Sequence, residues 1–205
     1  MSIYALKPRF QALLRPLVNA LHRAGATANQ ITLFACVISI AVGAAVALNA
    51  HDQRWFLLIP VWFFLRMAFN AIDGMLAREH DQRSVLGAYL NELTDVVSDA
   101  ALYAPFAFLP GVHPFVLGVV VLLAAVSEMT GVLGSALGAS RRYDGPMGKS
   151  DRAFVFGALG LSIGVGIVPA QWLTIVLSGI GLLVCVTIVN RVRRGIAEID
   201  TRSNA

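Results

Sequence analysis

Five charged side chains between positions 70 and 99 stand in or beside stretches that are otherwise apolar enough to lie in a membrane. They are Asp73, Arg78, Glu92, Asp95 and Asp99. Burying a carboxylate at the centre of a bilayer costs about 2.5–3.5 kcal/mol on insertion scales, so several together require a compensating function. An ion path, a proton relay or a metal site would each supply one.

Helical spacing gathers the polar side chains on two faces. Asn70 and Asp73 are three residues apart and share one face of a predicted helix. Asn91, Asp95 and Asp99 recur every four residues on the next helix and form a single stripe. The polar connection between the two helices is short, which predicts antiparallel neighbours that face one another.

The chemistry that suits these faces is metal and phosphate binding. Carboxylate and amide oxygens without nitrogen or sulfur ligands favour a hard cation such as Mg²⁺ or Mn²⁺. Arg78, at the rim of the expected pocket, is placed to meet an anion. A divalent metal beside an arginine indicates a diphosphate site rather than an ion channel.

The composition predicts an all-α polytopic membrane protein that forms a single domain. Hydrophobic residues make up 57% of the 205 residues and charged residues only 14%, against about 25% charged in soluble domains; the mean hydropathy is +0.71. We expect an amphipathic interfacial helix over 1–26, a six-helix bundle over 27–195 and a cytoplasmic tail over 196–205. The predicted spans are 30–49, 55–77, 86–108, 114–138, 153–169 and 171–191.

Basic residues follow the expected topology rather than a nucleic-acid surface. They gather before the first span, in alternate loops and at the end of the chain, whereas the other loops, near 50–54, 109–113 and 168–171, contain only Arg54. The positive-inside rule then places both termini and the polar pocket on the cytoplasmic side. We expect an integral protein of a bacterial inner membrane that binds no nucleic acid.

The polar cluster also carries a family resemblance. The segment 73–78 reads DGMLAR, and Gly87, position 91 and Asp95 follow at fixed distances. This pattern resembles the CDP-alcohol phosphatidyltransferase signature, D-x2-D-G-x2-A-R-x8-G-x3-D-x3-D. The resemblance extends to the amphipathic N-terminal helix, the six spans and the Asn29-x-x-Thr32 pair that enters the first span. It implies transfer of a phosphatidyl group, usually from CDP-diacylglycerol, to a hydroxyl acceptor with release of CMP.

The resemblance also implies roles for individual residues. Asp73 and Asp95 match metal-ligand positions, and Asp95 matches the general base for the acceptor hydroxyl. Gly74 and Ala77 would leave room for the cytidine, and Arg78 would hold the diphosphate. The remaining positions expected at the nucleotide site are Gly87, Asn29 and Thr32.

The sequence departs from the signature at two of its four aspartates. Asn70 and Asn91 keep an oxygen ligand but lose a negative charge. One tightly held metal is then the simpler expectation, and a substrate diphosphate would help to bind a second. Asp99 is either a displaced ligand or a partner of the ligands. Glu92 projects away from Asn91 and has either a packing or a catalytic role.

The loop 141–152 is the second candidate site. Its basic residues and its glycine and proline turn suit binding of a phosphorylated acceptor or a lipid head group, and we assign Arg141, Lys149 and Arg152 to this role. Arg66 and Glu128 are expected to form structural ion pairs across helices. Small residues on the later spans predict close helix packing and a homodimer.

Two alternative functions remain compatible with the residues. One is a catalytically silent relative that binds metal, nucleotide or lipid. The other is an ion or proton transporter, which would also explain acids within the membrane but needs no DGxxAR spacing.

Overall fold

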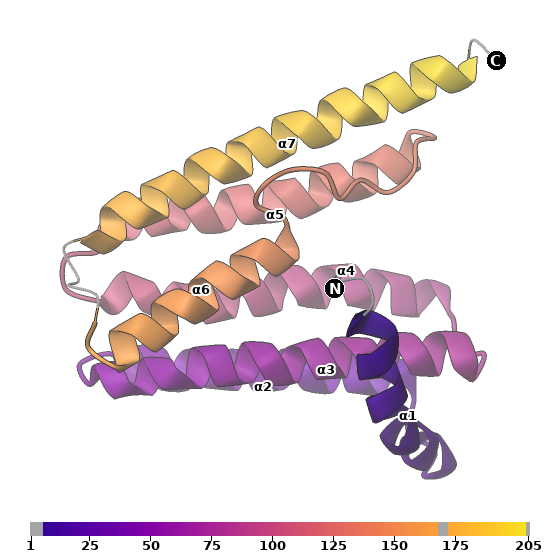
Figure 1. Ribbon diagram of the computed structural model, residues 1–205, viewed down its shortest axis with the longest axis horizontal. Helices are drawn as coiled ribbons and strands as arrows, with labels where there is room; N and C mark the ends of the chain where they lie inside the picture. Colours follow the sequence, from indigo (N-terminus) through magenta and orange to yellow (C-terminus); the bar gives the residue numbers. More distant parts are fainter. Residues whose placement is uncertain (1–5, 168–171, 204–205) are drawn as a thin grey trace.

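The computed structural model describes residues 6–167 and 172–203, and these residues form helices and connecting turns with no strand. The α-helices are α1 (Leu6–Arg23), α2 (Ala28–Leu48), α3 (Leu58–Glu79), α4 (Val85–Tyr103), α5 (Pro114–Ala136), α6 (Lys149–Gly164) and α7 (Leu173–Ser203), with short 3-10 helices η2 (Gln53–Leu57) and η3 (Ala104–Phe108). Figure 1 shows that α2 to α7 run lengthwise beside one another, while α1 crosses the bundle at one end.

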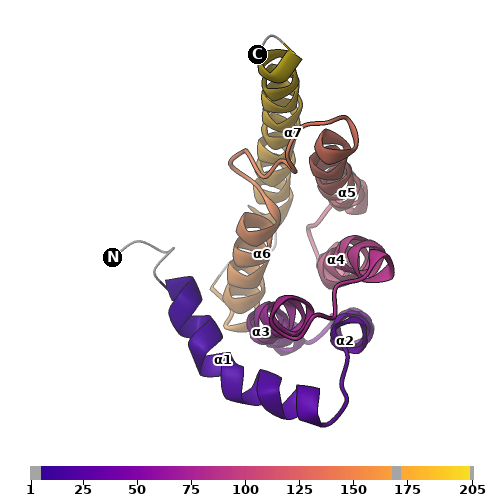
Figure 2. The ribbon, with the colours of Figure 1, turned by 90° about the vertical axis from the view of Figure 1, so that its right-hand side faces the viewer.

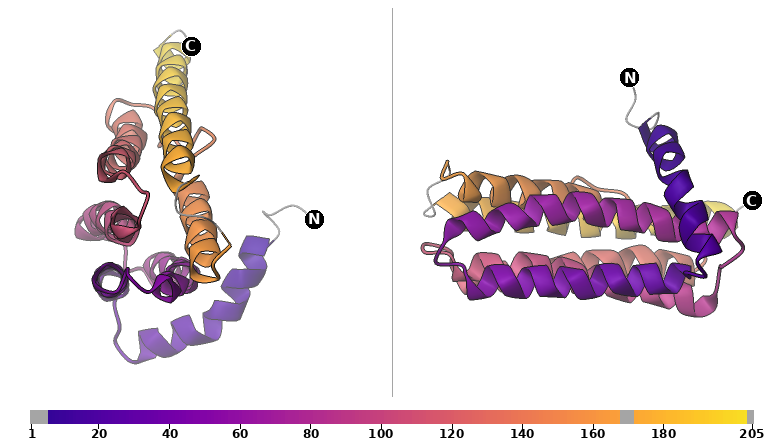
Figure 3. Two further views of the ribbon diagram at one scale, coloured as in Figure 1. Left: turned by 90° about the vertical axis from the view of Figure 1, so that its left-hand side faces the viewer. Right: turned by 90° about the horizontal axis from the view of Figure 1, so that it is seen from below.

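The bundle is open in cross-section rather than closed around one axis (Figure 2). α2 packs against both α3 and α4, α5 packs against α7, and α6 packs against α3 and η2. α1 lies across the outside of α3, where Arg15 donates hydrogen bonds of 3.0 and 3.1 Å to Glu79. α1 and the C-terminal end of α7 lie at the same end of the molecule (Figure 3).

Four segments are long and apolar enough to cross a membrane: Ala28–Leu48, Gln53–Glu79, Pro114–Ala136 and Leu173–Ser203. α4 has 19 residues but carries three acids, and α6 has only 16 residues. The prediction of an all-helical membrane protein is therefore confirmed, and the count of six spans stays a prediction. The predicted turn at 168–171 and residues 1–5 lie outside the described residues.

Helix boundaries follow local chemistry closely at the start of α2. Thr27 accepts a 3.2 Å hydrogen bond from the Gln30 amide, and the Gln30 side chain accepts a 2.9 Å hydrogen bond from the Thr27 amide. These two reciprocal hydrogen bonds form a capping box. At the other end of the chain, α7 continues without a break to Ser203, so the predicted boundary between bundle and tail at 195 falls inside a helix.

The second and third spans, predicted to face one another, are in contact through side chains, because Arg66 on α3 bonds Asp95 and Asp99 on α4. α3 and α4 are not among the closely packed helix pairs of the described chain, because α2 packs against both. A Cβ added at Gly43 on α2 would overlap the carbonyl oxygen of Ala101 on α4, so glycine allows this close approach. α3 and α4 instead meet through long charged side chains.

A cluster of aromatic side chains packs the C-terminal end of α4 and η3 against α6. Tyr103 stacks on Phe156 with ring centroids 3.9 Å apart, and Phe106 meets Phe156 edge to face at 5.3 Å. All three side chains are fully buried. This cluster joins the end of α4 and η3 to the middle of α6.

Candidate active site

A cavity of about 390 Å³ opens beside α2, α3 and α4. Volumes of this order are typical of small-molecule sites. All residues predicted to bind the nucleotide line it, and so do one aspartate and one asparagine among the predicted metal ligands. These lining residues are Asn29, Thr32, Asp73, Gly74, Ala77, Arg78, Gly87 and Asn91. The structure thus brings together residues that are spread over 63 positions of the chain in three helices, from 29 to 91.

Asp73 is held in place by α2. It is only 6% exposed, and Thr32 donates a 2.8 Å hydrogen bond to its Oδ2 atom. The charges of Asp95 and Lys149 both act on Asp73 from the side of α4 and α6. A carboxylate oriented by one neighbour and close to a second carboxylate is suited to share a cation.

Two glycines make room for polar side chains at the cavity wall. A Cβ at Gly74 would lie 3.1 Å from Nη2 of Arg78, because the guanidinium folds back over this position. A Cβ at Gly87 would lie 2.7 Å from Oδ1 of Asn29. Side chains at either glycine would therefore displace residues that line the cavity.

Asp95 lies beside the cavity and is paired with two basic side chains. Arg66 donates a 3.0 Å hydrogen bond to its Oδ1 atom, and Lys149 contacts its Oδ2 atom. Arg66 is 4% exposed and also bonds Oδ1 of Asp99 at 2.5 Å. The predicted structural pairing of Arg66 is confirmed, with two acids on α4 as its partners.

Asp99 and Arg152 lie deeper than the cavity and do not line it. Arg152 Nη2 is 3.5 Å from Asp99 Oδ2, so both Asp99 oxygens face arginines. Of the two roles left open for Asp99, this geometry favours a partner of Asp95 through Arg66. Arg152 has no exposed surface and does not line the cavity, so it does not lie at the cavity mouth, and its contact with an acceptor stays a prediction.

The loop between α5 and α6 folds back into the bundle instead of projecting from it (Figure 1). Its backbone bonds to α5 through Arg142 N and Gly131 O at 3.2 Å, and to α7 through Met147 N and Thr187 Oγ1 at 2.9 Å. Gly145 adopts a φ of +122° against Thr187. α6 therefore begins inside the protein, and this is why Arg152 is buried.

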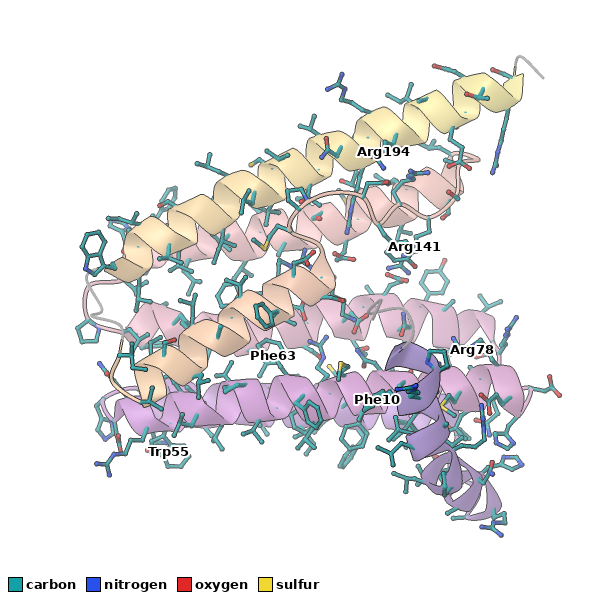
Figure 4. All side chains as sticks on the ribbon, viewed as in Figure 1. Phe10, Trp55, Phe63, Arg78, Arg141 and Arg194 are labelled. Atoms are coloured by element: carbon teal, nitrogen blue, oxygen red, sulfur yellow. The ribbon has the colours of Figure 1, made fainter. Side chains whose placement is uncertain are left out.

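Arg141 comes from this returning loop and lies in the space between α4 and α5 (Figure 4). Its guanidinium pairs with Glu92, which lines the cavity. Arg78 and Arg194 lie toward the same end of the bundle as Arg141, whereas Trp55 marks the opposite end. Glu92 thus has a pairing role that the sequence left open.

The donors around the cavity fit a hard divalent cation only in part. Among the described residues, no group of three His, Cys, Asp or Glu side chains could hold a metal ion. Asp73 and Asn91 line the cavity, Asp95 stands beside it, and Asn70 is half-buried but outside the lining. An ion here would be held by two carboxylates, amide oxygen and the oxygens of a substrate, which agrees with the low protein charge predicted for the site.

Six lining residues, four of them polar, were not predicted as site residues from the sequence, although Glu92 was considered for catalysis. Gln82, Arg83 and Ser84 belong to the connection between α3 and α4. The Gln82 side chain accepts a 2.7 Å hydrogen bond from the Ala28 amide and so ties this connection to α2. The signal available in the sequence was the polar character of the connection, which was used only to predict a turn.

Three comparisons with known proteins bear on this site. The model of the CDP-alcohol phosphatidyltransferase family matches residues 26–189. The inner membrane protein YnbA of Escherichia coli is 43% identical over 94% of this chain and 96% of its own length. Archaetidylinositol phosphate synthase of Aeropyrum pernix is 29% identical over 73% of this chain and 75% of its own.

Solved structures show the same fold. The phosphatidylinositol phosphate synthase of Mycobacterium tuberculosis with CDP-DAG bound superposes with a TM-score of 0.72 at 20% identity, covering 88% of this chain and 92% of the other. The same protein in complex with manganese and citrate gives a TM-score of 0.70 at 19% identity, covering 88% and 87%.

Proposed function

This chain belongs to the CDP-alcohol phosphatidyltransferase family, and we propose that it transfers a phosphatidyl group from CDP-diacylglycerol to a hydroxyl acceptor with release of CMP. It is an integral membrane enzyme of phospholipid synthesis. The observation that carries the proposal is the single cavity lined by Asp73, Gly74, Ala77, Arg78 and Gly87. These are the residues of the predicted nucleotide–diphosphate site.

Binding of the nucleotide would use the cavity as a whole. The small residues Gly74, Ala77 and Gly87 leave space for the cytidine against the helix backbones. Arg78 would pair with the diphosphate, whose charge a guanidinium recognises in a bidentate manner. Asn29 and Thr32 supply further polar contacts from α2. A nucleotide carried on a lipid suits a site at the cytoplasmic end of the bundle.

A divalent cation, Mg²⁺ or Mn²⁺, would be held by Asp73 and Asp95 with help from Asn70 and Asn91. Such an ion neutralises the diphosphate and makes CMP a better leaving group. Manganese is present in one structure of the mycobacterial relative, which supports the choice of cation. The two carboxylates support one ion held by the protein, and a second would depend on the substrate.

Asp95 would take the proton from the acceptor hydroxyl. Its two oxygens contact Arg66 and Lys149, which hold the carboxylate in one orientation next to Asp73. The acceptor would reach Asp95 from the side of α5 and α6, where Lys149 and Arg141 are available to orient it. We propose the remaining features as predicted: both termini and the site face the cytoplasm of a bacterial inner membrane, and small-residue faces of the later spans serve a homodimer.

The test is CMP release from CDP-diacylglycerol by the purified protein with Mg²⁺ or Mn²⁺. A panel of acceptors should include polyols, polyol phosphates, amino acids and amino alcohols. We expect release with at least one acceptor and a loss of at least about 100-fold in Asp73→Ala and Asp95→Ala. Asp200→Ala, an exposed acid near the end of α7, is the matched control. Full activity in both site variants would contradict the assigned mechanism.

The two rivals give different results in the same experiments. A silent relative would bind CDP-diacylglycerol but release no CMP with any acceptor. An ion or proton transporter would carry metal-dependent flux in liposomes without binding the nucleotide.

A further inference from the structure

Three arginines from three segments converge on one carboxylate, that of Glu128 on α5. Arg152 of α6 and Arg191 of α7 lie 3.0 and 3.4 Å from Glu128 Oε1 through their Nη2 and Nη1 atoms. Nη2 of Arg141, from the returning loop, lies 3.9 Å from Oε2. We call these four residues the Glu128 cluster. A carboxylate surrounded by guanidinium groups occupies the position that a bound anion would take.

The Glu128 cluster adjoins the reacting groups on the side away from the nucleotide cavity. Arg152 also faces Asp99, and Asp99 shares Arg66 with Asp95. Arg141 also pairs with Glu92 at the cavity wall. A molecule whose hydroxyl approaches Asp95 from α5 and α6 would therefore meet Lys149, which contacts Asp95, and then the arginines of this cluster.

The cluster has no room for another anion. Arg152 is 0% exposed and Arg191 is 2% exposed. The void beside Asp99, Tyr103, Glu128 and Arg152 has a volume of about 10 Å³, which is near the minimum for one water molecule. An acceptor phosphate would have to displace the Glu128 carboxylate to reach these arginines.

The cluster is rich in donors, and Glu128 supplies its negative charge. Arg141, Arg152 and Arg191 each keep a buried Nε–H group without a partner among the described residues. If Glu128 lost its charge, Arg191 would keep the Ser127 carbonyl, 2.5 Å from its Nη1 atom, as its acceptor in this cluster. The arginines would then form a buried cationic site with an affinity for phosphate.

Resting on the proposed function, we propose that Glu128 is a specificity-determining residue that excludes phosphorylated acceptors. Glu128 occupies the anion position of the arginine cluster, so the acceptor is an uncharged polyol rather than a polyol phosphate. Glu128 excludes a phosphate in two ways: its side chain fills the anion position, and its negative charge repels the negative charge of the phosphate. Such repulsion is an established way of rejecting a wrong ligand. This assignment differs from the phosphorylated products named for the archaeal and mycobacterial relatives.

The first experiment compares acceptor pairs in the CMP-release assay: glycerol against glycerol phosphate, and inositol against inositol phosphate. We expect the wild type to prefer the unphosphorylated member of a pair by at least about tenfold in kcat/KM. Glu128→Ala, which removes both the charge and the volume of the side chain, should shift that ratio toward the phosphorylated member by about tenfold, while Glu128→Asp should keep the wild-type preference. Glu198→Gln, which removes a carboxylate paired with Arg142 and Arg202 away from the cluster, should leave the ratio unchanged.

A binding experiment separates this inference from the proposed function. Inorganic phosphate is added to metal-free protein, and the thermal unfolding midpoint is followed. We expect a phosphate-dependent rise in Glu128→Ala that exceeds the rise in the wild type, Glu128→Asp and Glu198→Gln. Equal rises in all four proteins, or a wild type that prefers phosphorylated acceptors, would overturn the inference. Absence of CMP release with every acceptor would instead contradict the proposed function, and the phosphate result would still decide the role of Glu128.

Discussion

Thr32 on α2 donates a 2.8 Å hydrogen bond to Asp73 on α3, and so the first residue of the DGxxAR run is oriented from a neighbouring helix. Thr32 lies about one turn into α2, just after the capping box that fixes where this helix begins. The position of the capping residues therefore sets the position of the hydroxyl. The entrance of α2 and the carboxylate form one unit at the cavity wall.

Replacing Thr32 with valine should weaken catalysis without unfolding the protein. Valine fills the same space but removes the side-chain donor to the Asp73 carboxylate, a loss of about 1.5–3 kcal/mol for a hydrogen bond to a charged group. We expect CMP release to fall about tenfold and the Mn²⁺ concentration for half-maximal rate to rise. Thr32→Ser should recover most of the rate. Equal losses in the valine and serine variants would argue against a role for the hydroxyl.

Much of the cavity follows from sequence alone because its residues are fixed by local geometry. The spacing from Asp73 to Arg78 and from Gly87 to Asn91 determines which side chains share a helix face, and the structure places these faces around one cavity. The capping residues at Thr27 likewise fix a helix start through contacts within four residues. Such features require no knowledge of how distant helices pack.

Helix packing was not predictable in the same way. A short connection between two helices indicates antiparallel directions, but it does not exclude a third helix that packs against both. α2 takes this place because Gly43 allows it to approach Ala101 closely. The sequence shows many small residues, and nothing in their spacing identifies which one meets α4.

The returning loop is the other feature that spacing could not reveal. Its basic residues match the positive-inside rule, which describes loops outside the membrane. Irregular backbone within a membrane protein is tolerated where the protein itself satisfies its polar groups. Here Gly131 on α5 and Thr187 on α7 provide the acceptors, and these partners are 11 and 40 residues away from the loop residues they bond, Arg142 and Met147.

Asn91→Asp should strengthen metal binding more than Asn70→Asp. Asn91 lines the cavity, whereas Asn70 does not. A new carboxylate beside Asp73 adds charge attraction for a divalent cation, and we expect the Mn²⁺ concentration for half-maximal CMP release to fall about tenfold. Titration of both variants with Mn²⁺ under the same conditions gives the comparison. Equal effects of the two substitutions would contradict the different placements of the two side chains.

The anchoring of the returning loop should depend on pH through Asp144, which lies outside the helices. Burial alone would raise the pKa of Asp144, but hydrogen bonds and charges from Arg142 and Arg194 outweigh it and hold the pKa below its usual value. A lowered pKa in the folded protein means that the stabilisation is complete above the unfolded value near 3.8 and is lost as the pH falls further. The unfolding midpoint of the wild type should therefore exceed that of Asp144→Asn at pH above about 5, and the difference should shrink toward pH 3. A difference that grows on acidification would contradict this sign.

Gly43→Ala should destabilise the bundle, because Gly43 is buried where α2 packs against α4. A Cβ at this position overlaps the backbone oxygen of Ala101, so α2 and α4 must move apart. Overpacking of this kind costs about 1–3 kcal/mol.

Gly118→Ala on α5 is the matched control, because a Cβ there has nothing within 4 Å and alanine has the higher helix propensity. Thermal unfolding in detergent should show a lower midpoint for Gly43→Ala and an unchanged or higher one for Gly118→Ala. The same separation of α2 from α4 would shift Thr32 relative to Asn91, so CMP release should fall in Gly43→Ala even at temperatures where the protein remains folded.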